Sequence, residues 1–155
     1  MTPAQNDIEI KLRDLGIVLK GPKPPVAQYV GTRRSGNLLF VSGRVSELQG
    51  EVGTDIAEDQ AKAAARDTLV LLLSIIKQDI KDLNLISGVI KLQGFIRSSP
   101  QFTRQPQVLD GASELLIALF GEAGYHARTA TGVAQLPFGA AIQLDMVLEM
   151  KDVEK

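Results

Sequence analysis

Two long stretches of the chain place apolar residues at the spacing of one helix face. Residues 55–83 open with Asp55 and Glu58 and carry a continuous apolar stripe, which predicts the longest helix. Residues 106–120 repeat the pattern, and Gly121 and Gly124 are typical stop signals after it. The stripe of the first consists of Ala61, Ala65, Leu69, Leu72, Ile76, Ile80 and Leu83, and that of the second of Val108, Ala112, Leu115, Leu116 and Leu119.

A shorter helix is predicted near the N-terminus. Thr2 is placed to cap it, and Gly16 is placed to end it. Ile8, Leu12 and Leu15 share one face at helical spacing. Residues 21–25 contain three prolines, so they are predicted to form a loop.

The remaining segments have the composition of strands. Residues 26–33 and 38–45 flank a short polar stretch and predict an antiparallel hairpin, with Arg33 and Arg34 at its solvated tip. Residues 89–97, 126–135 and 140–150 predict three more strands, the last two joined at residues 136–139. One face of the last strand is entirely apolar, whereas the other is mixed and includes Gln143 and Asp145.

The order of these elements predicts an α+β fold, a mixed sheet with helices on one face. A chain of 155 residues fits one domain, here residues 1–155 with a helical extension at 1–20 and a core at 26–150. The half-polar face of the last strand would remain uncovered in such a subunit. We therefore expect the sheet to bury that face by oligomerising.

Composition excludes several kinds of function. Lys and Arg number 17 against 18 Asp and Glu, so the chain has no basic excess and nucleic acid is an unlikely partner. With no cysteine and His126 as the only histidine, neither a cysteine nor a multi-histidine metal site can form within one chain. Every apolar run is much shorter than the length of about 18 residues that a membrane-spanning helix needs. The N-terminus lacks a signal-peptide pattern. We expect a cytoplasmic protein without membrane partners.

Three segments carry a resemblance to a known family. Residues 37–43 read NLLFVSG after an upstream Tyr29, residues 121–137 read GEAGYHARTATGVAQLP, and residues 136–142 read LPFGAAI. Together they resemble the YjgF/RidA family, also called endoribonuclease L-PSP proteins, over about residues 25–149. The N-terminal helix and the longer region at residues 100–109 indicate a separate subgroup.

This resemblance implies a fold, an assembly and an activity. The fold would be chorismate-mutase-like, in a homotrimer whose sheets surround a central barrel. Small carboxylate substrates would bind in clefts between subunits, without a cofactor or metal. The reaction would be an imine deaminase reaction, the hydrolysis of reactive enamines or 2-imino acids such as 2-iminobutanoate and 2-iminopropanoate to keto acids and ammonia.

Arg128 is the residue expected to bind the substrate carboxylate. A guanidinium presents two parallel donors to a carboxylate, and it stays charged when partly buried. An isolated arginine more often forms a structural ion pair, and the family-like segment around Arg128 is what favours the site. The resemblance further implies substrate contacts from Tyr29, from Ser42 and Gly43 at a strand end, from Phe95 and from Ala130, where several relatives carry cysteine.

Position 143 departs from the family pattern. Gln143 lies fifteen residues beyond Arg128, where many active members carry a glutamate that holds the attacking water. Glutamine can orient water but cannot accept its proton at neutral pH. Asp145 shares the face of Gln143 but lies about 7 Å further along the strand. Asp110 falls near a position at which the family often has asparagine, but it is interpreted mainly as a helix residue. His126 could transfer protons beside Arg128, but it is interpreted as a structural histidine.

Three functions therefore stay open. A hydrolase of imines is the leading hypothesis, with Arg128 and Gln143 as its catalytic residues. A non-catalytic binding protein for 2-keto acids is the alternative, because Gln143 would allow binding without turnover. Endoribonuclease activity ranks lower, since the chain has neither a basic excess nor a histidine pair, and aromatic residues make up only 5% of it.

Overall fold

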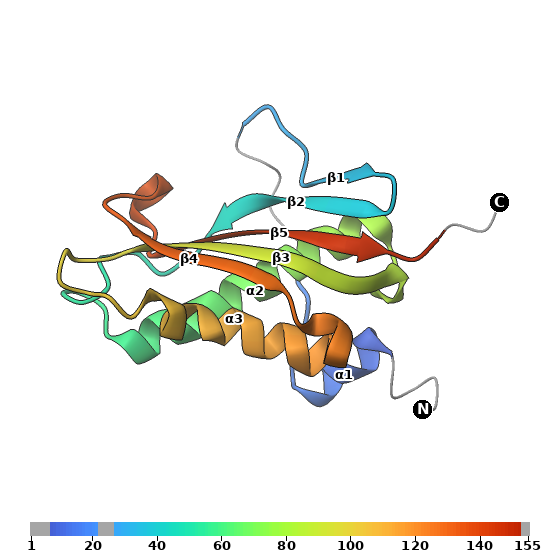
Figure 1. Ribbon diagram of the computed structural model, residues 1–155, viewed down its shortest axis with the longest axis horizontal. Helices are drawn as coiled ribbons and strands as arrows, with labels where there is room; N and C mark the ends of the chain where they lie inside the picture. Colours follow the sequence, from blue (N-terminus) through green and yellow to red (C-terminus); the bar gives the residue numbers. More distant parts are fainter. Residues whose placement is uncertain (1–6, 22–26, 153–155) are drawn as a thin grey trace.

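The computed structural model describes residues 7–21 and 27–152 (Figure 1). Within these residues, three α-helices and five strands follow one another in the expected order, with three short 3-10 helices between them. They are α1 Ile8–Asp14, β1 Thr32–Ser35, β2 Leu38–Val45, α2 Glu58–Ile80, η2 Leu83–Leu85, β3 Ile86–Arg97, α3 Gln105–Phe120, η3 Gly121–Gly124, β4 Ala127–Val133, η4 Pro137–Gly139 and β5 Ile142–Met150.

The strands form one sheet in the order β1-β2-β5-β3-β4. All neighbours are antiparallel except β3 and β4, which run parallel. Helices α2 and α3 lie side by side on one face of the sheet, and no helix of the described chain covers the other (Figure 1). The predicted α+β class and the one-sided mixed sheet are therefore confirmed.

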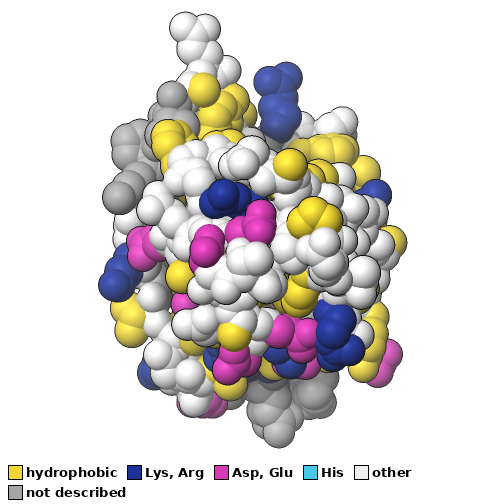
Figure 2. All heavy atoms as spheres, turned by 90° about the vertical axis from the view of Figure 1, so that its left-hand side faces the viewer, with side chains coloured by type: hydrophobic (Ala, Val, Ile, Leu, Met, Phe, Trp, Pro, Cys, Tyr) yellow, Lys and Arg dark blue, Asp and Glu magenta, His cyan; other side chains and the backbone are white. Residues whose placement is uncertain are grey.

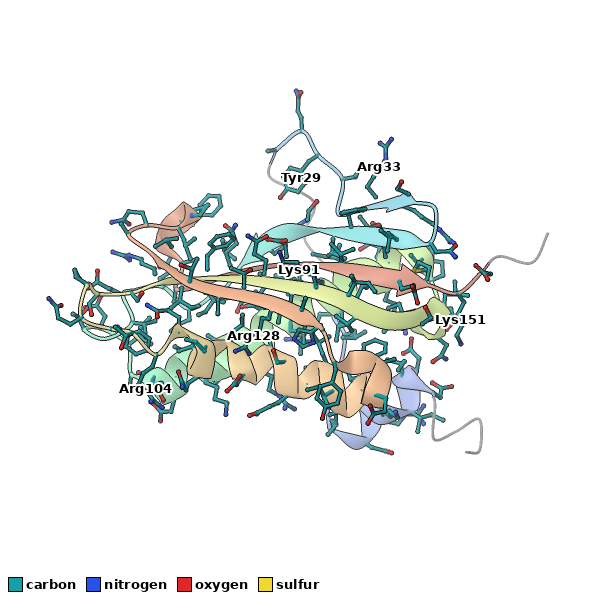
Figure 3. The ribbon with its side chains drawn as sticks, in the orientation of Figure 1. Tyr29, Arg33, Lys91, Arg104, Arg128 and Lys151 are labelled. Atoms are coloured by element: carbon teal, nitrogen blue, oxygen red, sulfur yellow. The ribbon has the colours of Figure 1, made fainter. Side chains whose placement is uncertain are left out.

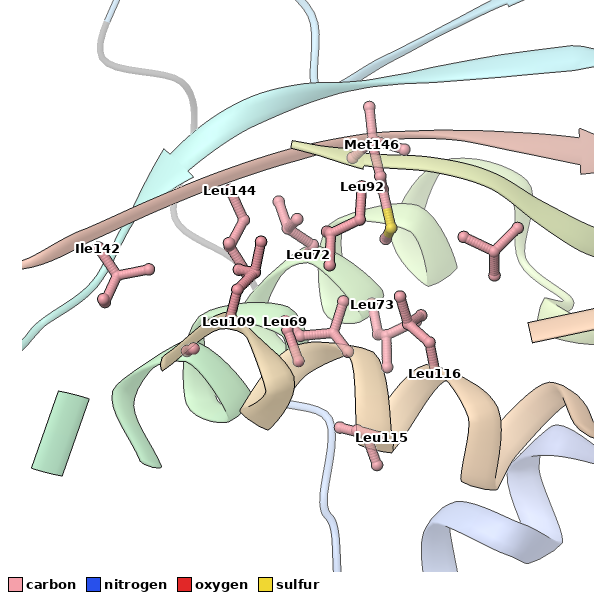
Figure 4. Packing of buried hydrophobic residues seen from close by; sticks show 14 of the residues in the cluster. Leu69, Leu72, Leu73, Leu92, Leu109, Leu115, Leu116, Ile142, Leu144 and Met146 are labelled. Atoms are coloured by element: carbon pink, nitrogen blue, oxygen red, sulfur yellow. The ribbon is translucent and has the colours of Figure 1, made fainter. Parts of the chain in front are cut away.

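The hydrophobic core lies between the sheet and the two long helices (Figure 4). In β5, Ile142, Leu144, Met146, Leu148 and Met150 all face the helices and are at most 3% exposed. The leucines of the two helical stripes fill the space beneath them. The alternation in β5 and the apolar stripes of the two helices thus correctly predicted which face of each element is buried.

The segment before β2 differs from the predicted hairpin. Strand β1 is limited to Thr32–Ser35, and residues 27–31 form no strand. The prediction that Ser42 and Gly43 end a strand is wrong, because β2 continues to Val45. The pairing of β2 with β5 shifts in register between Val41 and Arg44. This β-bulge lies in the pairing of β2 with β5, whereas on the other side of β2 the Ser42 N–H bonds the Gly31 carbonyl at 2.9 Å and continues the register of β1 with β2. Val26 lies outside the described residues.

Helix α1 is anchored to the end of the core. The side chain of Asp7 caps it by accepting from the N–H groups of Glu9 and Ile10, whereas the predicted cap, Thr2, lies outside the described residues. Lys11 Nζ donates to the Leu119 carbonyl at 3.0 Å. Gly16 ends the helical segment in a left-handed conformation with φ +73°, as predicted. Among the described residues, no helix is long and apolar enough to cross a membrane.

Candidate functional site

Arg128 lies on β4, an edge strand of the sheet, with its side chain toward α3 (Figure 3). It points there because its partner in β3, Leu92, belongs to the core face of the sheet. Its Nη1 donates to Asp110 Oδ1 at 2.7 Å and to Ser113 Oγ at 3.1 Å. Its Nη2 donates to the Pro106 carbonyl at 3.3 Å. Helix α3 therefore fixes the guanidinium through residues at one helical face.

A second set of hydrogen bonds holds Ser113. The Nδ1 of His126 lies 2.6 Å from the Gly124 carbonyl, and its Nε2 lies 2.9 Å from Ser113 Oγ. Because a carbonyl only accepts, Nδ1 must carry a proton. Ser113 Oγ, which accepts from Arg128 Nη1, also lies within hydrogen-bond distance of Nε2. His126, which directly precedes β4, and Arg128 thus meet at one hydroxyl group.

The guanidinium retains unused donors. Both hydrogens of Nη1 are taken by Asp110 and Ser113, and one hydrogen of Nη2 by Pro106. No hydrogen bond within residues 7–21 and 27–152 uses Nε of Arg128. The side chain is 25% exposed. Because α3 holds the opposite edge, the Nε and Nη2 edge is the one that could bind a carboxylate.

Ala130 follows Arg128 on the same face of β4 and lines an open groove of about 450 Å³. The loop at residues 98–105 forms the other wall of this groove. Gln105 fastens the loop, since its Nε2 donates to Ser98 Oγ at 3.2 Å and to the Phe102 carbonyl at 2.8 Å. A Cβ on Gly132 would lie 2.7 Å from both Gln105 Nε2 and Ser98 Oγ, so a larger residue there would have to displace these two side-chain ends.

The other predicted site residues lie on the opposite face of the sheet. Gln143 and Phe95 are paired in neighbouring strands and are both half-buried there. A Cβ on Gly43 would lie 3.4 Å from the Gln143 amide nitrogen, so the bulge and this side chain are in contact. Ser42 Oγ donates to the Val30 carbonyl at 2.6 Å and so fastens the bulge to the segment that begins with the exposed Tyr29.

The predicted site residues thus form two groups in one chain. Arg128 and Ala130 lie on the helix side of the sheet at its β4 edge, whereas Gln143, Phe95 and Gly43 lie on the open side. Strands β3 and β5 separate β4 from β2. The alternation of side chains along a strand accounts for the division, since residue 128 pairs with a core position and residue 143 does not.

Asp145 lies on β5, the central strand, on the open face of the sheet. It is paired with Gln93, and burial raises the pKa of its carboxyl group, while the charge of Lys91 opposes this shift. It faces away from Arg128, because it lies on the side of the sheet opposite the helices. The described residues contain no group of three His, Asp or Glu side chains that could hold a metal ion.

Sequence reasoning did not assign the polar partners of Arg128. Asp110 was interpreted as a helix residue, and Ser113 was not singled out at all. The available signal was their spacing, because Pro106, Asp110 and Ser113 recur at intervals of four and three on a helix whose other face is apolar. Such a polar row indicates a shared face, but it does not reveal which strand the face meets.

Fold and site together define an α+β protein in which an arginine on an edge strand is held by one face of helix α3. A family model described as "YjgF/chorismate mutase-like, putative endoribonuclease" matches residues 18–149. The chain belongs to this family, and helix α1 precedes the matched part. The predicted resemblance is therefore confirmed.

Individual relatives agree with this assignment. The chain is 38% identical to Protein TCP17 of Trypanosoma cruzi, over 96% of this chain and 98% of that protein. A solved protein of unknown function from Agrobacterium tumefaciens is 39% identical, covers 96% of this chain and 95% of its own, and superposes with a TM-score of 0.87. A solved "putative endoribonuclease" from Shewanella oneidensis is 27% identical, covers 94% and 100%, and has a TM-score of 0.89.

Proposed function

We propose that the protein hydrolyses small enamines or 2-imino acids that carry a carboxylate, and releases the keto acid and ammonia. The observation that supports this proposal is how the guanidinium of Arg128 is held. Its guanidinium is held from one side by Asp110, Ser113 and Pro106, while its Nε edge bonds none of the described residues. A preorganised fork of this kind suits a carboxylate whose attached carbon must be presented in a fixed direction.

The electrophile in this reaction is the substrate itself. A protonated imine carries its positive charge next to the carbon that water attacks, so the protein needs only to hold the carboxylate and to place the water. Ala130 leaves space beside the arginine, and the groove along residues 130–134 offers room for a substrate side chain. The 2-iminobutanoate and 2-iminopropanoate class fits these requirements.

We further propose that the active form is a homotrimer with sites between subunits. The open sheet face exposes Leu38, Phe40 and Ile90, each at least 36% exposed, and an apolar surface of this kind is typical of an interface. The two groups of site residues lie on opposite sides of the sheet in one chain. Packing of one subunit's β4 edge against another subunit's open face would bring Arg128 toward Tyr29, Phe95 and Gly43. Light scattering at micromolar concentration should give three times the chain mass, and a monomer would exclude such a site.

A binding function is the second candidate. Gln143 replaces the carboxylate that many family members use to activate water, so the site could hold 2-keto acids without turnover. Endoribonuclease activity, which the Shewanella relative's name suggests, ranks below both, because the formal net charge is −1 and His126 is the only histidine. RNA cleavage that persists in Arg128→Ala after nuclease-free repurification would reverse this ranking.

The test is a coupled assay in which a flavin amino-acid oxidase generates 2-imino acids and semicarbazide traps those that survive. The wild type should lower the trapped amount, whereas Arg128→Ala should not. Arg66→Ala is the matched control, because Arg66 is an exposed arginine on α2 and should leave the activity unchanged. If the wild type has no effect on any imine, while 2-keto acids still raise its melting temperature, the binding function is the correct one.

A further inference from the structure

Arg128 can bind a substrate carboxylate only while the Nε and Nη2 edge of its guanidinium stays free of the chain's own carboxylates. Among the described residues, Asp110 is the carboxylate that pairs with it, through Nη1. We propose that His126 is a positioning residue for Arg128 and that it acts through the hydroxyl group of Ser113. The inference rests on the proposed function, because the free edge is the one that would take the substrate.

Ser113 holds the guanidinium at its Nη1 end. An arginine and a carboxylate often form a bidentate pair through two nitrogens. Asp110 instead bonds Nη1, since Ser113 Oγ takes the other hydrogen of Nη1 at 3.1 Å. The Pro106 carbonyl accepts from Nη2 at 3.3 Å. Residues 110 and 113 lie about one turn apart on α3, so the Nη1 end is fixed at two points and the Nε edge is turned away from α3.

The hydroxyl group of Ser113 is directed differently from other buried hydroxyl groups on the helices. Thr68 and Ser74, both on α2, donate to the carbonyl four residues earlier in their own helix, at 2.7 and 3.0 Å. Within residues 7–21 and 27–152, Ser113 makes no such bond to Leu109, and its partners are Arg128 and His126. Groups on and directly before β4 therefore turn this hydroxyl group away from its own helix.

His126 supplies the acceptor that makes this direction possible. A hydroxyl group offers its lone pairs to Arg128 only if its hydrogen points elsewhere. A proton on Nδ1 of His126 is donated to the Gly124 carbonyl at 2.6 Å, so Nε2 of the neutral ring carries a lone pair, 2.9 Å from Ser113 Oγ. Gly124 is itself packed on α3, because a Cβ there would lie 2.5 Å from the Leu116 carbonyl oxygen. The ring is thus anchored to a fixed carbonyl.

His126 does not contact the proposed substrate site. Within the described chain, its ring bonds Gly124 and Ser113 and makes no bond to Arg128 itself. It does not line the groove beside Ala130. The end of the molecule that carries the loop at residues 98–105 shows no histidine side chain (Figure 2). Its effect on the arginine therefore passes through the Ser113 hydroxyl group.

Loss of the ring would change how the chain's own carboxylate pairs with Arg128. The Ser113 hydroxyl group could then donate to the Leu109 carbonyl, as Ser74 does to the carbonyl four residues before it. Nη1 would lose an acceptor, and Asp110 could pair with two nitrogens of the guanidinium and compete with the substrate carboxylate. Such competition weakens ground-state and transition-state binding equally, so it raises KM and leaves kcat unchanged.

His126→Phe tests the proposal, because it keeps an aromatic ring but removes both nitrogens. A neutral hydrogen bond of this kind contributes a factor of about three to ten, so the KM for 2-iminobutanoate and the Kd of 2-oxobutanoate should each rise about three- to tenfold. The first is measured in the coupled assay and the second by calorimetry. The value of kcat should stay within about 1.5-fold of the wild type.

Three further variants show whether the effect passes through Ser113. Ser113→Ala should raise KM and Kd as His126→Phe does, and the double variant should be no weaker than either single variant. His126→Gln keeps an acceptor near the position of Nε2, so its Kd should stay within about 1.5-fold of the wild type. Ser74→Ala, which removes a buried helix hydroxyl group far from Arg128 in the sequence and on the other helix, is the matched control and should leave the Kd unchanged.

Each outcome separates this inference from the proposed function. An unchanged Kd in His126→Phe, additive losses in the double variant, or a loss confined to kcat overturns the inference and leaves the hydrolase intact. If His126→Phe does not fold, a Kd that rises in Ser113→Ala but not in His126→Gln supports the inference, and equal values overturn it. A wild type that hydrolyses no imine but binds 2-oxobutanoate with this dependence on His126 rejects the hydrolase and retains the positioning role. A wild type that neither hydrolyses imines nor binds 2-oxobutanoate rejects both.

Discussion

Ser113 is the residue whose removal tests the arrangement around Arg128 most directly. Its hydroxyl group accepts from the charged guanidinium and lies 2.9 Å from His126 Nε2, and the residue is only 8% exposed. A hydrogen bond to a charged group contributes about 1.5–3 kcal/mol and a neutral one about 0.5–1.5 kcal/mol. Arg128 is partly exposed, so water can replace part of this loss. Ser113→Ala should therefore lower the free energy of unfolding by about 1–3 kcal/mol.

The matched control is Ser74→Ala. Ser74 is equally buried, at 6% exposed, and lies on α2, but among the described residues its hydroxyl group bonds only the Val70 carbonyl of its own helix, at 3.0 Å. Replacing such a serine by alanine improves helix propensity while it removes one local bond, so the change should stay within about 0.5 kcal/mol. The difference between the two variants isolates the bonds that Ser113 makes to β4 and the segment before it.

Urea unfolding at a fixed protein concentration gives both free energies. For a domain of this size, 1 kcal/mol corresponds to a melting-temperature change of about 2–4 °C, which calorimetry resolves. Nitrogen-detected NMR adds an independent reading, because His126 is the only histidine and gives an unambiguous ring signal. The neutral ring should carry its proton on Nδ1. A cost for Ser113→Ala no larger than that of Ser74→Ala, or a proton on Nε2, would refute the arrangement.

Three further predictions follow from the site and its surroundings. Arg128→Lys keeps the charge but loses the planar fork, so the affinity for 2-oxobutanoate should fall at least about tenfold in calorimetry. Gly132→Ala places a methyl group against the ends of the Gln105 and Ser98 side chains, so it should change stability by less than about 1 kcal/mol but should speed limited proteolysis of the loop at residues 98–105. Asp145 binds its proton more tightly when folded than when unfolded, so wild-type stability should fall as pH rises through the window above the ordinary pKa of an aspartate. Asp145→Asn should be more stable than the wild type above that window and should lack this slope in pH-dependent unfolding.

Much of the fold was predictable because burial imposes a period on the sequence. The alternation in β5 and the stripes in α2 and α3 each reflect one face turned to a common core, and the structure confirms them. The bulge at Ser42 and Gly43 was missed, since nothing local to β2 distinguishes a strand end from a shift in register. Strand β1 is also shorter than predicted, although the Ser42 N–H still bonds the Gly31 carbonyl in continuation of the register of β1 with β2.

The candidate site was predictable only in part. Arg128 was found through the segment around it, whereas Asp110 and Ser113 lie 18 and 15 residues earlier and meet it only after α3 packs beside β4. Their approach depends on the parallel pairing of β3 with β4, which places α3 along the edge strand. The spacing of these residues along the chain does not indicate how close their side chains come in the fold. The separation of Arg128 from Gln143 likewise depends on strand order and on which face each residue takes.

The central position of β5 also has a consequence for how the protein is made. Both strands that β5 pairs with, β2 and β3, precede it in the chain. During synthesis, α2 and α3 can associate early, but the sheet beneath them has a gap until β5 emerges, and β2 and β3 expose unpaired edges on either side of it. Nascent chains halted before residue 142 would present these edges together with the uncovered leucines of both helices. Ribosome stalling within this interval is therefore the stage at which we expect the chain to need a holding chaperone.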